Sequence, residues 1–257
     1  MSAILFFWAC VVSAEQLPGF EGLPGRAGGT VTEVIDGDTV VLSNGDEVRM
    51  VGIQAPKLPL GRAGFRTWPL AEEAKSALEA LSRNRRFDAY FGGQRKDRHG
   101  RALAHLVSPD GIWLQGEMLR LGMARVYSFP DNRALIDEML QLEREARAGS
   151  FGIWSHPFYR VLTLSGLEDR AGTFQIVEGT VADAADVRGT VYLNFGADWR
   201  TDFTVAIRKP ARRLFEADDP ASWTGRALRV RGWLRERNGP MIEATHPEQI
   251  ELRKEQE

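Results

Sequence analysis

The stretch VIDGDTVVLSNGDEVRMVGIQAPK, residues 34–57, decides the fold. It contains most of two β-rich runs, 30–43 and 47–53. They are joined around Asn44-Gly45, a dipeptide that tolerates the positive φ angles of a tight hairpin turn. The same stretch places Asp36 and Asp38 on either side of a glycine. We therefore expect a β-hairpin that carries a pair of carboxylates.

The residues that follow alternate between helical and extended patterns. Apolar residues recur at helical spacing in 70–82, so a helix is expected there. Further strands or helices are expected at 86–91, 102–107, 113–121, 124–127 and 132–148. Strands interrupted by one helix and closed by two more predict a mainly β fold with α (α+β), a small barrel capped by helices.

The pattern lapses at 163–172, and we place a domain boundary there. Beyond it, five strand-like runs with one short helix between the third and fourth predict a second small OB-like β-barrel. A chain of 257 residues exceeds the usual single-domain length of ~100 to 200 residues. The expected domains are 30–162 and 173–253.

The N-terminus has the character of an export signal. Residues 1–14, MSAILFFWACVVSA, carry no charge and end in a small-residue cleavage pattern. We expect a signal peptide and a secreted or periplasmic protein; a buried N-terminal strand is the alternative. Half of residues 16–29 are Gly or Pro, so 15–29 are expected to form a flexible linker. The only cysteine, Cys10, lies in the signal segment, which leaves the mature chain without disulfides.

The charge balance limits how the chain attracts nucleic acid. The net charge is −2, so affinity for a polyanion has to come from local clusters. Residues 83–101 hold seven basic side chains against two acidic ones. This surplus either follows a sugar-phosphate backbone or forms an ordinary solvated face. The composition is that of a soluble globular protein, and we expect a monomer without a membrane span.

The pair Asp36 and Asp38 has two readings. Two carboxylates with Arg49 delivered from the neighbouring strand can hold a hard cation against a phosphate. An Asp-Gly-Asp tripeptide also makes many ordinary turns. A third element favours the first reading, because Asp97 and Arg101 open a later strand and a second arginine can close on the same phosphate.

A series of motifs in order resembles the staphylococcal nuclease (thermonuclease) family across most of the first domain. The motifs are Ile35 to Thr39, Arg49 with Val51 to Ile53 and Pro56, Asp97 to Arg101, Gly122 to Ala124, and Gly152 to Ser155. The resemblance implies an OB-like five-stranded barrel with three helices, and Ca²⁺-dependent hydrolysis of DNA or RNA.

Carried over by position, the resemblance makes Asp38 and the Ala55 carbonyl metal ligands, and Arg49 and Arg101 the catalytic contacts to phosphate. Asp36 becomes an auxiliary acid.

Two positions depart from the family pattern. Gln54 stands where the family has a second metal-binding aspartate, and its neutral amide oxygen should hold calcium more weakly. Lys57 stands where the family has the glutamate that serves as general base. An ammonium group cannot take a proton from water, so Lys57 either slows the enzyme or itself contacts phosphate.

Other candidate nucleic-acid contacts are Arg98, Tyr127 and Trp233. Tyr127 lies where the family stacks a base on tyrosine, and core packing is the alternative. Trp233 is flanked by arginines on one face of an alternating strand, a pattern that suits base stacking and equally a solvated face.

The sequence thus favours an exported metal-dependent nuclease acting on DNA or RNA with little sequence preference. A non-catalytic nucleic-acid-binding protein and an envelope protein that binds polypeptide remain as alternatives.

Overall fold

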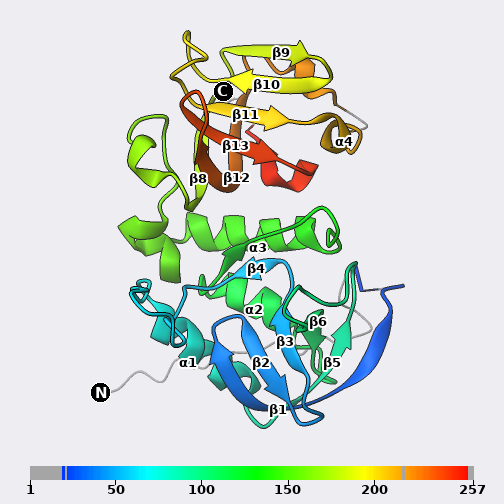
Figure 1. The fold of residues 1–257 in the computed structure, drawn as a ribbon. Helices are drawn as coiled ribbons and strands as arrows, with labels where there is room; N and C mark the ends of the chain where they lie inside the picture. The colour runs from blue at the N-terminus through cyan, green and yellow to red at the C-terminus, as the bar shows by residue number, and fades with distance from the viewer. Residues whose placement is uncertain (1–18, 21, 216–217, 254–257) are drawn as a thin grey trace. The chain divides into compact units, whose positions relative to one another are not determined.

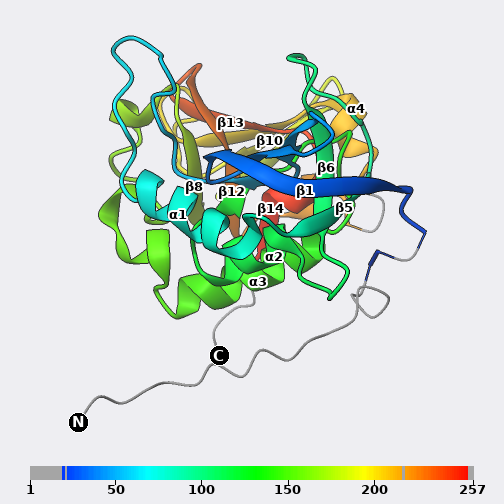
Figure 2. The same cartoon turned by 90° about the horizontal axis from the view of Figure 1, so that it is seen from below.

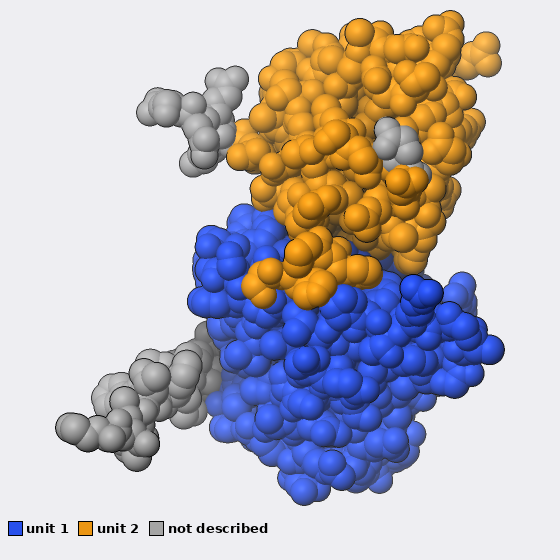
Figure 3. Space-filling model, turned by 90° about the vertical axis from the view of Figure 1, so that its left-hand side faces the viewer, with its two compact units in different colours: residues 1–127, 131–154 blue, residues 128–130, 155–257 orange. Residues whose placement is uncertain are grey.

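The computed structural model describes residues 19–20, 22–215 and 218–253, and the expected signal peptide lies outside these ranges. The chain divides into two compact units, coloured separately in Figure 3. The first holds the described residues up to Tyr127 together with Asp131–Trp154. The second holds Ser128–Pro130 and the residues from Ser155 onward.

The first unit is built on a closed five-stranded barrel in the order β1-β2-β3-β6-β5 (Figure 1). Its strands are β1 (Gly25–Asp36), β2 (Thr39–Leu42), β3 (Glu47–Met50), β5 (Arg86–Tyr90) and β6 (Ala102–Val107). A separate antiparallel pair consists of β4 (Ile53–Gln54) and β7 (Arg125–Val126). The predicted five-stranded barrel is confirmed.

The hairpin at Asn44-Gly45 is also confirmed. Strands β2 and β3 pair antiparallel, and Gly45 has a φ of 84°. The run expected as one strand over 30–43 is instead two strands, β1 and β2, which pair antiparallel with Asp36 opposite Thr39. The two acidic residues therefore lie at the tight turn between β1 and β2.

Three α-helices complete the described part of this unit, as the resemblance implies: α1 (Ala71–Ser82), α2 (Leu114–Arg120) and α3 (Ile136–Ala148). Helix α1 packs against β1, and α2 packs against α3 (Figures 1 and 2). Helix α3 begins four residues later than expected, because Leu135 has a φ of 63°, which an α-helix does not permit. Buried residues of these helices and of the strands form one core.

Strand β1 begins at Gly25, inside the segment expected to be a flexible linker, so that prediction is wrong for residues 25–29. A Cβ at Gly28 would lie 1.9 Å from the carbonyl oxygen of Phe87, so glycine allows β1 to approach β5 this closely. Phe20 is buried as well. Its ring packs edge-to-face on the rings of Tyr90, His105 and Trp113. One aromatic side chain thus anchors the segment before the barrel.

Phe20→Ala is expected to lower the free energy of unfolding by about 3 kcal/mol, because it empties a site in the core. The exposed Leu60 offers a control, and Leu60→Ala should change stability by no more than about 0.5 kcal/mol. Urea denaturation of the full chain measures both. Equal stability of Phe20→Ala and the native chain would show that this segment does not fold onto the barrel.

The second unit is a seven-stranded sheet. Six strands follow the order β14-β12-β13-β11-β10-β9, and β8 pairs with β12. The strands are β8 (Phe174–Thr180), β9 (Asp183–Val187), β10 (Thr190–Asn194), β11 (Thr204–Ile207), β12 (Ala227–Glu236), β13 (Pro240–Ala244) and β14 (Ile250–Leu252). A short helix, α4 (Lys209–Arg212), follows β11.

This sheet is not closed into a barrel within the described residues, so the prediction of a second OB-like barrel is not confirmed. The reason lies in how the edges pair. The long strand β12 pairs with β8 over 227–233, and also with β14 over 228–230 and with β13 over 234–236. Strand β9 pairs with β10 alone among the described strands, which leaves its outer edge open.

Neither unit contains, in its described residues, a helix long and apolar enough to cross a membrane.

Candidate active site

The turn between β1 and β2 is shaped by the helix that covers it. A Cβ at Gly37 would lie 2.7 Å from the Cβ of Ala55 and 2.9 Å from the Cβ of Ala74 on α1. Only glycine therefore fits between the two acidic residues. The Asp38 backbone N–H donates to Asp36 Oδ1 at 3.1 Å, which fixes both carboxyl groups in one place. Asp36 and Asp38 are both buried.

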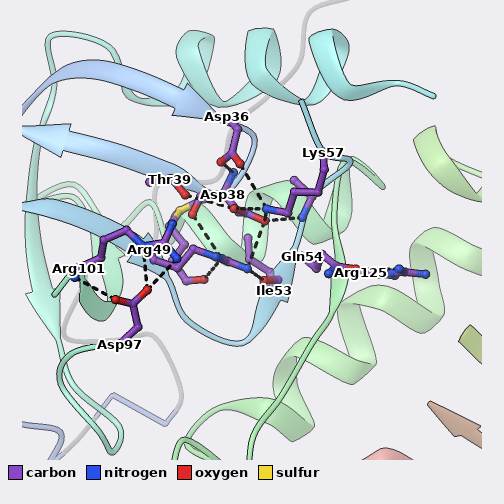
Figure 4. A network of polar contacts seen from close by, with 12 residues as sticks. Asp36, Asp38, Thr39, Arg49, Ile53, Gln54, Lys57, Asp97, Arg101 and Arg125 are labelled. Atoms are coloured by element: carbon purple, nitrogen blue, oxygen red, sulfur yellow. Dashed lines mark hydrogen bonds and ion pairs between the residues drawn. The ribbon is translucent and has the colours of Figure 1, made fainter. Parts of the chain in front are cut away.

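Lys57 places its ammonium group between these two carboxylates (Figure 4). Its Nζ donates to both oxygens of Asp38, at 2.6 and 2.7 Å, and to Asp36 Oδ2 at 3.3 Å. The Lys57 side chain is mostly buried, whereas that of Asp38 is fully buried. A cation that belongs to the chain itself thus stands at the acidic pair.

Arg49 approaches Asp38 from β3, with Nη2 at 3.3 Å from Asp38 Oδ2. Its other hydrogen bonds are to the backbone: Nη1 donates to the Met50 carbonyl at 2.6 Å and Nη2 to the Ile53 carbonyl at 2.7 Å. The arginine therefore holds the chain between β3 and β4 as well as the carboxylate. The predicted pairing of Asp38 with Arg49 is present, and the guanidinium is largely engaged.

The acidic pair has pKa values displaced in opposite directions. Burial raises the pKa of Asp36, the Asp38 carboxylate raises it further, and Lys57 opposes both. Burial would also raise the pKa of Asp38, but Arg49 and Lys57 outweigh it and hold that pKa well below its usual value. Asp38 is therefore ionised at neutral pH, and Asp36 is the acid that protonates first.

Gln54 and Ala55 do not offer free oxygens toward Asp38. The side-chain oxygen of Gln54 accepts two hydrogen bonds from Arg125, from Nε at 3.1 Å and from Nη2 at 2.7 Å. Ala55 meets Asp38 through its backbone N–H, which donates to Asp38 Oδ2 at 2.8 Å. Both contacts are buried.

These donors do not fit a calcium ion. Calcium takes six to eight oxygen ligands, and the oxygens of Asp38 already accept from Lys57, Arg49 and Ala55. The described residues contain no group of three or more His, Cys, Asp or Glu side chains able to hold a metal. The Ca²⁺ implied by the resemblance therefore has no ready site in this arrangement.

Arg101 does not join Asp38 and Arg49. Its guanidinium is bound by Asp97, with Nε donating to Oδ2 at 2.8 Å, and its next ionic partner is Glu47 at 4.0 Å. Figure 4 shows this pair pointing away from Lys57. The predicted convergence of both arginines on one phosphate is thus met by Arg49 alone.

The other predicted contacts are scattered. Arg98 donates from Nε to His99 Nε2 at 3.1 Å in an exposed turn. Tyr127 follows β7, where its N–H donates to the Gly52 carbonyl. Trp233 belongs to the second unit, half exposed on β12 with its ring edge-on to Phe174.

Sequence reasoning missed Arg125 as a partner in the site. The signal that points to it is strand pairing, since Gln54 is directly opposite Arg125 in the β4–β7 pair. A cationic group opposite a buried amide oxygen is a natural hydrogen-bond partner. Arg125 also lies over the ring of Trp68, at 5.8 Å.

Asp38→Asn is expected to lower the free energy of unfolding by about 3 to 5 kcal/mol at neutral pH, because Lys57 and Arg49 lose a buried partner. The stability that Asp38 contributes is present above its unfolded pKa of about 3.9 and is lost as pH falls through its lower folded pKa. Denaturation curves should show a constant difference from about pH 8 to about pH 5 that shrinks only in stronger acid. A difference that already shrinks near neutral pH would contradict the lowered pKa.

Comparison with known proteins matches a family model described as staphylococcal nuclease homologue to residues 47–156. An uncharacterised protein of Methanocaldococcus jannaschii is 30% identical over 149 residues, covering 49% of this chain and 71% of the relative. The protein ParB of Escherichia coli is 35% identical over 140 residues, covering 50% and 73%. The thermonuclease of Staphylococcus hyicus is 27% identical over 134 residues, covering 49% and 75%. Each match spans about half of this chain.

Proposed function

We propose that this chain, which belongs to the staphylococcal nuclease homologue family, binds the phosphodiester backbone of DNA or RNA with little sequence preference and hydrolyses it poorly. The observation that carries the proposal is the Lys57 ammonium group lodged between Asp36 and Asp38. With Arg49 it brings the charge of the four side chains to zero. A neutral cluster gives a divalent cation little reason to bind, and an ammonium group cannot serve as a base toward water.

Backbone binding is supported by a basic pocket of about 460 Å³ beside Arg101. Arg26 and Arg95 lie over the ring of Phe91, at 5.6 and 5.1 Å, and Lys96 also lines the pocket. Neither Arg95 nor Lys96 has a carboxylate partner among the described residues, whereas Arg26 is bound by Asp46. Such cations follow phosphates without reading bases, which agrees with low sequence preference.

A second candidate function is an exported metal-dependent nuclease. It is favoured by the names of relatives, a thermonuclease and uncharacterised endonucleases of Escherichia coli, and by the contact of Arg49 with Asp38. Lys57 would have to leave Asp38 for a metal to bind in this case. Export by residues 1–14 belongs to both candidates, and the N-terminal mass of the protein purified from its native host tests it.

The two candidates differ in how they respond to metal. Labelled single-stranded DNA is expected to be retained intact by the full chain, with equal affinity in calcium and in a chelator. Affinity should fall as salt rises, because the contacts are to phosphates. An electrophoretic assay reads retention and cleavage together. Calcium-dependent fragments produced at a rate typical of nucleases would overturn the first candidate and support the second.

Lys57→Glu is expected to create calcium binding, because it changes the charge of the cluster from zero to minus two and adds a carboxylate. Affinity should be weak, with a dissociation constant on the order of 10⁻⁴ to 10⁻³ M, since Gln54 stays bound to Arg125. Isothermal titration with calcium measures it. Lys57→Gln is the matched control, which removes the ammonium without adding a charge, and it should bind more weakly still. Calcium binding by the native chain equal to that of Lys57→Glu would contradict the role given to Lys57.

A further inference from the structure

Four strands of the second unit place a polar row across one face of the sheet. Asp183 on β9 is opposite Asn194 on β10, which is opposite Thr204 on β11, which pairs with Met241 on β13. Tyr192 lies two residues before Asn194 and therefore on the same face. The alternate residues of these strands pack in the core of the unit. The face away from the core thus carries an aromatic ring beside a row of hydrogen-bonding groups.

These side chains line a pocket of about 390 Å³, which Trp199 also lines. The volume is in the range of small-ligand sites, about 300 to 1,000 Å³. Trp199 is 49% exposed, and Arg200 lies over its ring at 4.5 Å. Among the described residues, neither Trp199 nor Tyr192 packs against another aromatic ring. Two free ring faces therefore border the same space.

The loop that carries Trp199 is held in place by its own hydrogen bonds. The Asp198 N–H donates to Asp202 Oδ2 at 2.8 Å, and the Asp202 N–H donates to the Asp198 carbonyl at 2.9 Å. A Cβ at Gly239 would lie 2.4 Å from the carbonyl oxygen of Thr201, so the loop packs closely on the turn before β13. Trp199 is thus a fixed wall of the pocket.

The polar groups of the pocket fit the edge of a nucleobase. Asn194 is nine-tenths buried, and its side-chain oxygen accepts from Thr204 Oγ1 at 3.2 Å. Its amide N–H₂ has no acceptor among the described residues and is available to a carbonyl oxygen. The neighbouring Asp183 carboxylate is an acceptor for a ring N–H or amino group. Arg237 also lines the pocket and has no carboxylate partner in the described chain, so it is available to a phosphate.

We propose that this pocket binds an unpaired base of single-stranded nucleic acid, stacked against Trp199 and Tyr192 and hydrogen-bonded by Asn194 and Asp183. The proposal rests on the proposed function in taking nucleic acid as the ligand, and it uses residues of the second unit alone. A base in a duplex keeps its pairing edge occupied, so the pocket selects single strands. The aromatic rings supply affinity, and the row of polar groups orients the base.

The experiment compares variants of the full chain by fluorescence anisotropy with a labelled oligothymidylate and with a duplex of equal length. Trp199→Ala is expected to weaken single-strand binding about 10-fold and to leave duplex binding unchanged, because stacking is lost. Tyr192→Ala should act in the same direction, and Tyr192→Phe should restore most of the affinity. Phe158→Ala, which removes an exposed aromatic outside the pocket, is the matched control and should bind as the native chain does.

Three outcomes separate this proposal from the function proposed for the first unit. Loss of single-strand affinity in Trp199→Ala but not in Phe158→Ala supports it. Equal affinity of Trp199→Ala and the native chain overturns it, and backbone binding by the barrel stands. If the native chain retains no oligonucleotide, the proposed function fails. Saturation-transfer NMR with free thymidine then decides, since transfer that disappears in Trp199→Ala supports the pocket and absence of transfer overturns it.

Discussion

The charge balance between Lys57 and the two buried carboxylates is the constraint on which the candidate site depends. A buried carboxylate without a partner costs several kcal/mol, and the fully buried Asp38 is satisfied by Lys57, Arg49 and the Ala55 N–H together. Because all three donors come from residues 49–57, the segment that follows the hairpin is tied to the turn between β1 and β2. The site is therefore part of what closes the barrel at this end.

Local signals in the sequence were sufficient for the barrel and its hairpin. Asn44-Gly45 specifies a turn through its backbone conformation, and the helical spacing of 70–82 specifies α1, whatever the rest of the chain does. The resemblance placed Asp36, Asp38 and Arg49 together correctly in outline. The place of Lys57 could not be derived, because it lies in an irregular segment without periodicity and its contacts with the acidic pair are tertiary.

Features that depend on competition between distant partners were predicted less well. Arg101 was expected to face the acidic pair, but Asp97, four residues earlier, provides a nearer carboxylate. The second barrel was inferred from the number of strand-like runs, and that number is the same for open and closed sheets. Closure depends on which edges pair, and β12 places its partners so that β9 keeps an open edge. Neither choice has a local sequence signature.

The two departures from the family pattern act in the same direction. Lys57 supplies a charge that an external cation would otherwise supply, and Gln54 gives its oxygen to Arg125 instead of leaving it for a metal. Each substitution removes one acidic group, and each new side chain is satisfied by partners within the chain. Reversing Lys57 alone restores the charge but leaves Gln54 held by Arg125, so the ligand set stays short of the six to eight oxygens that calcium prefers. The site is therefore better described as a self-neutralised cluster than as a calcium site that lacks one residue.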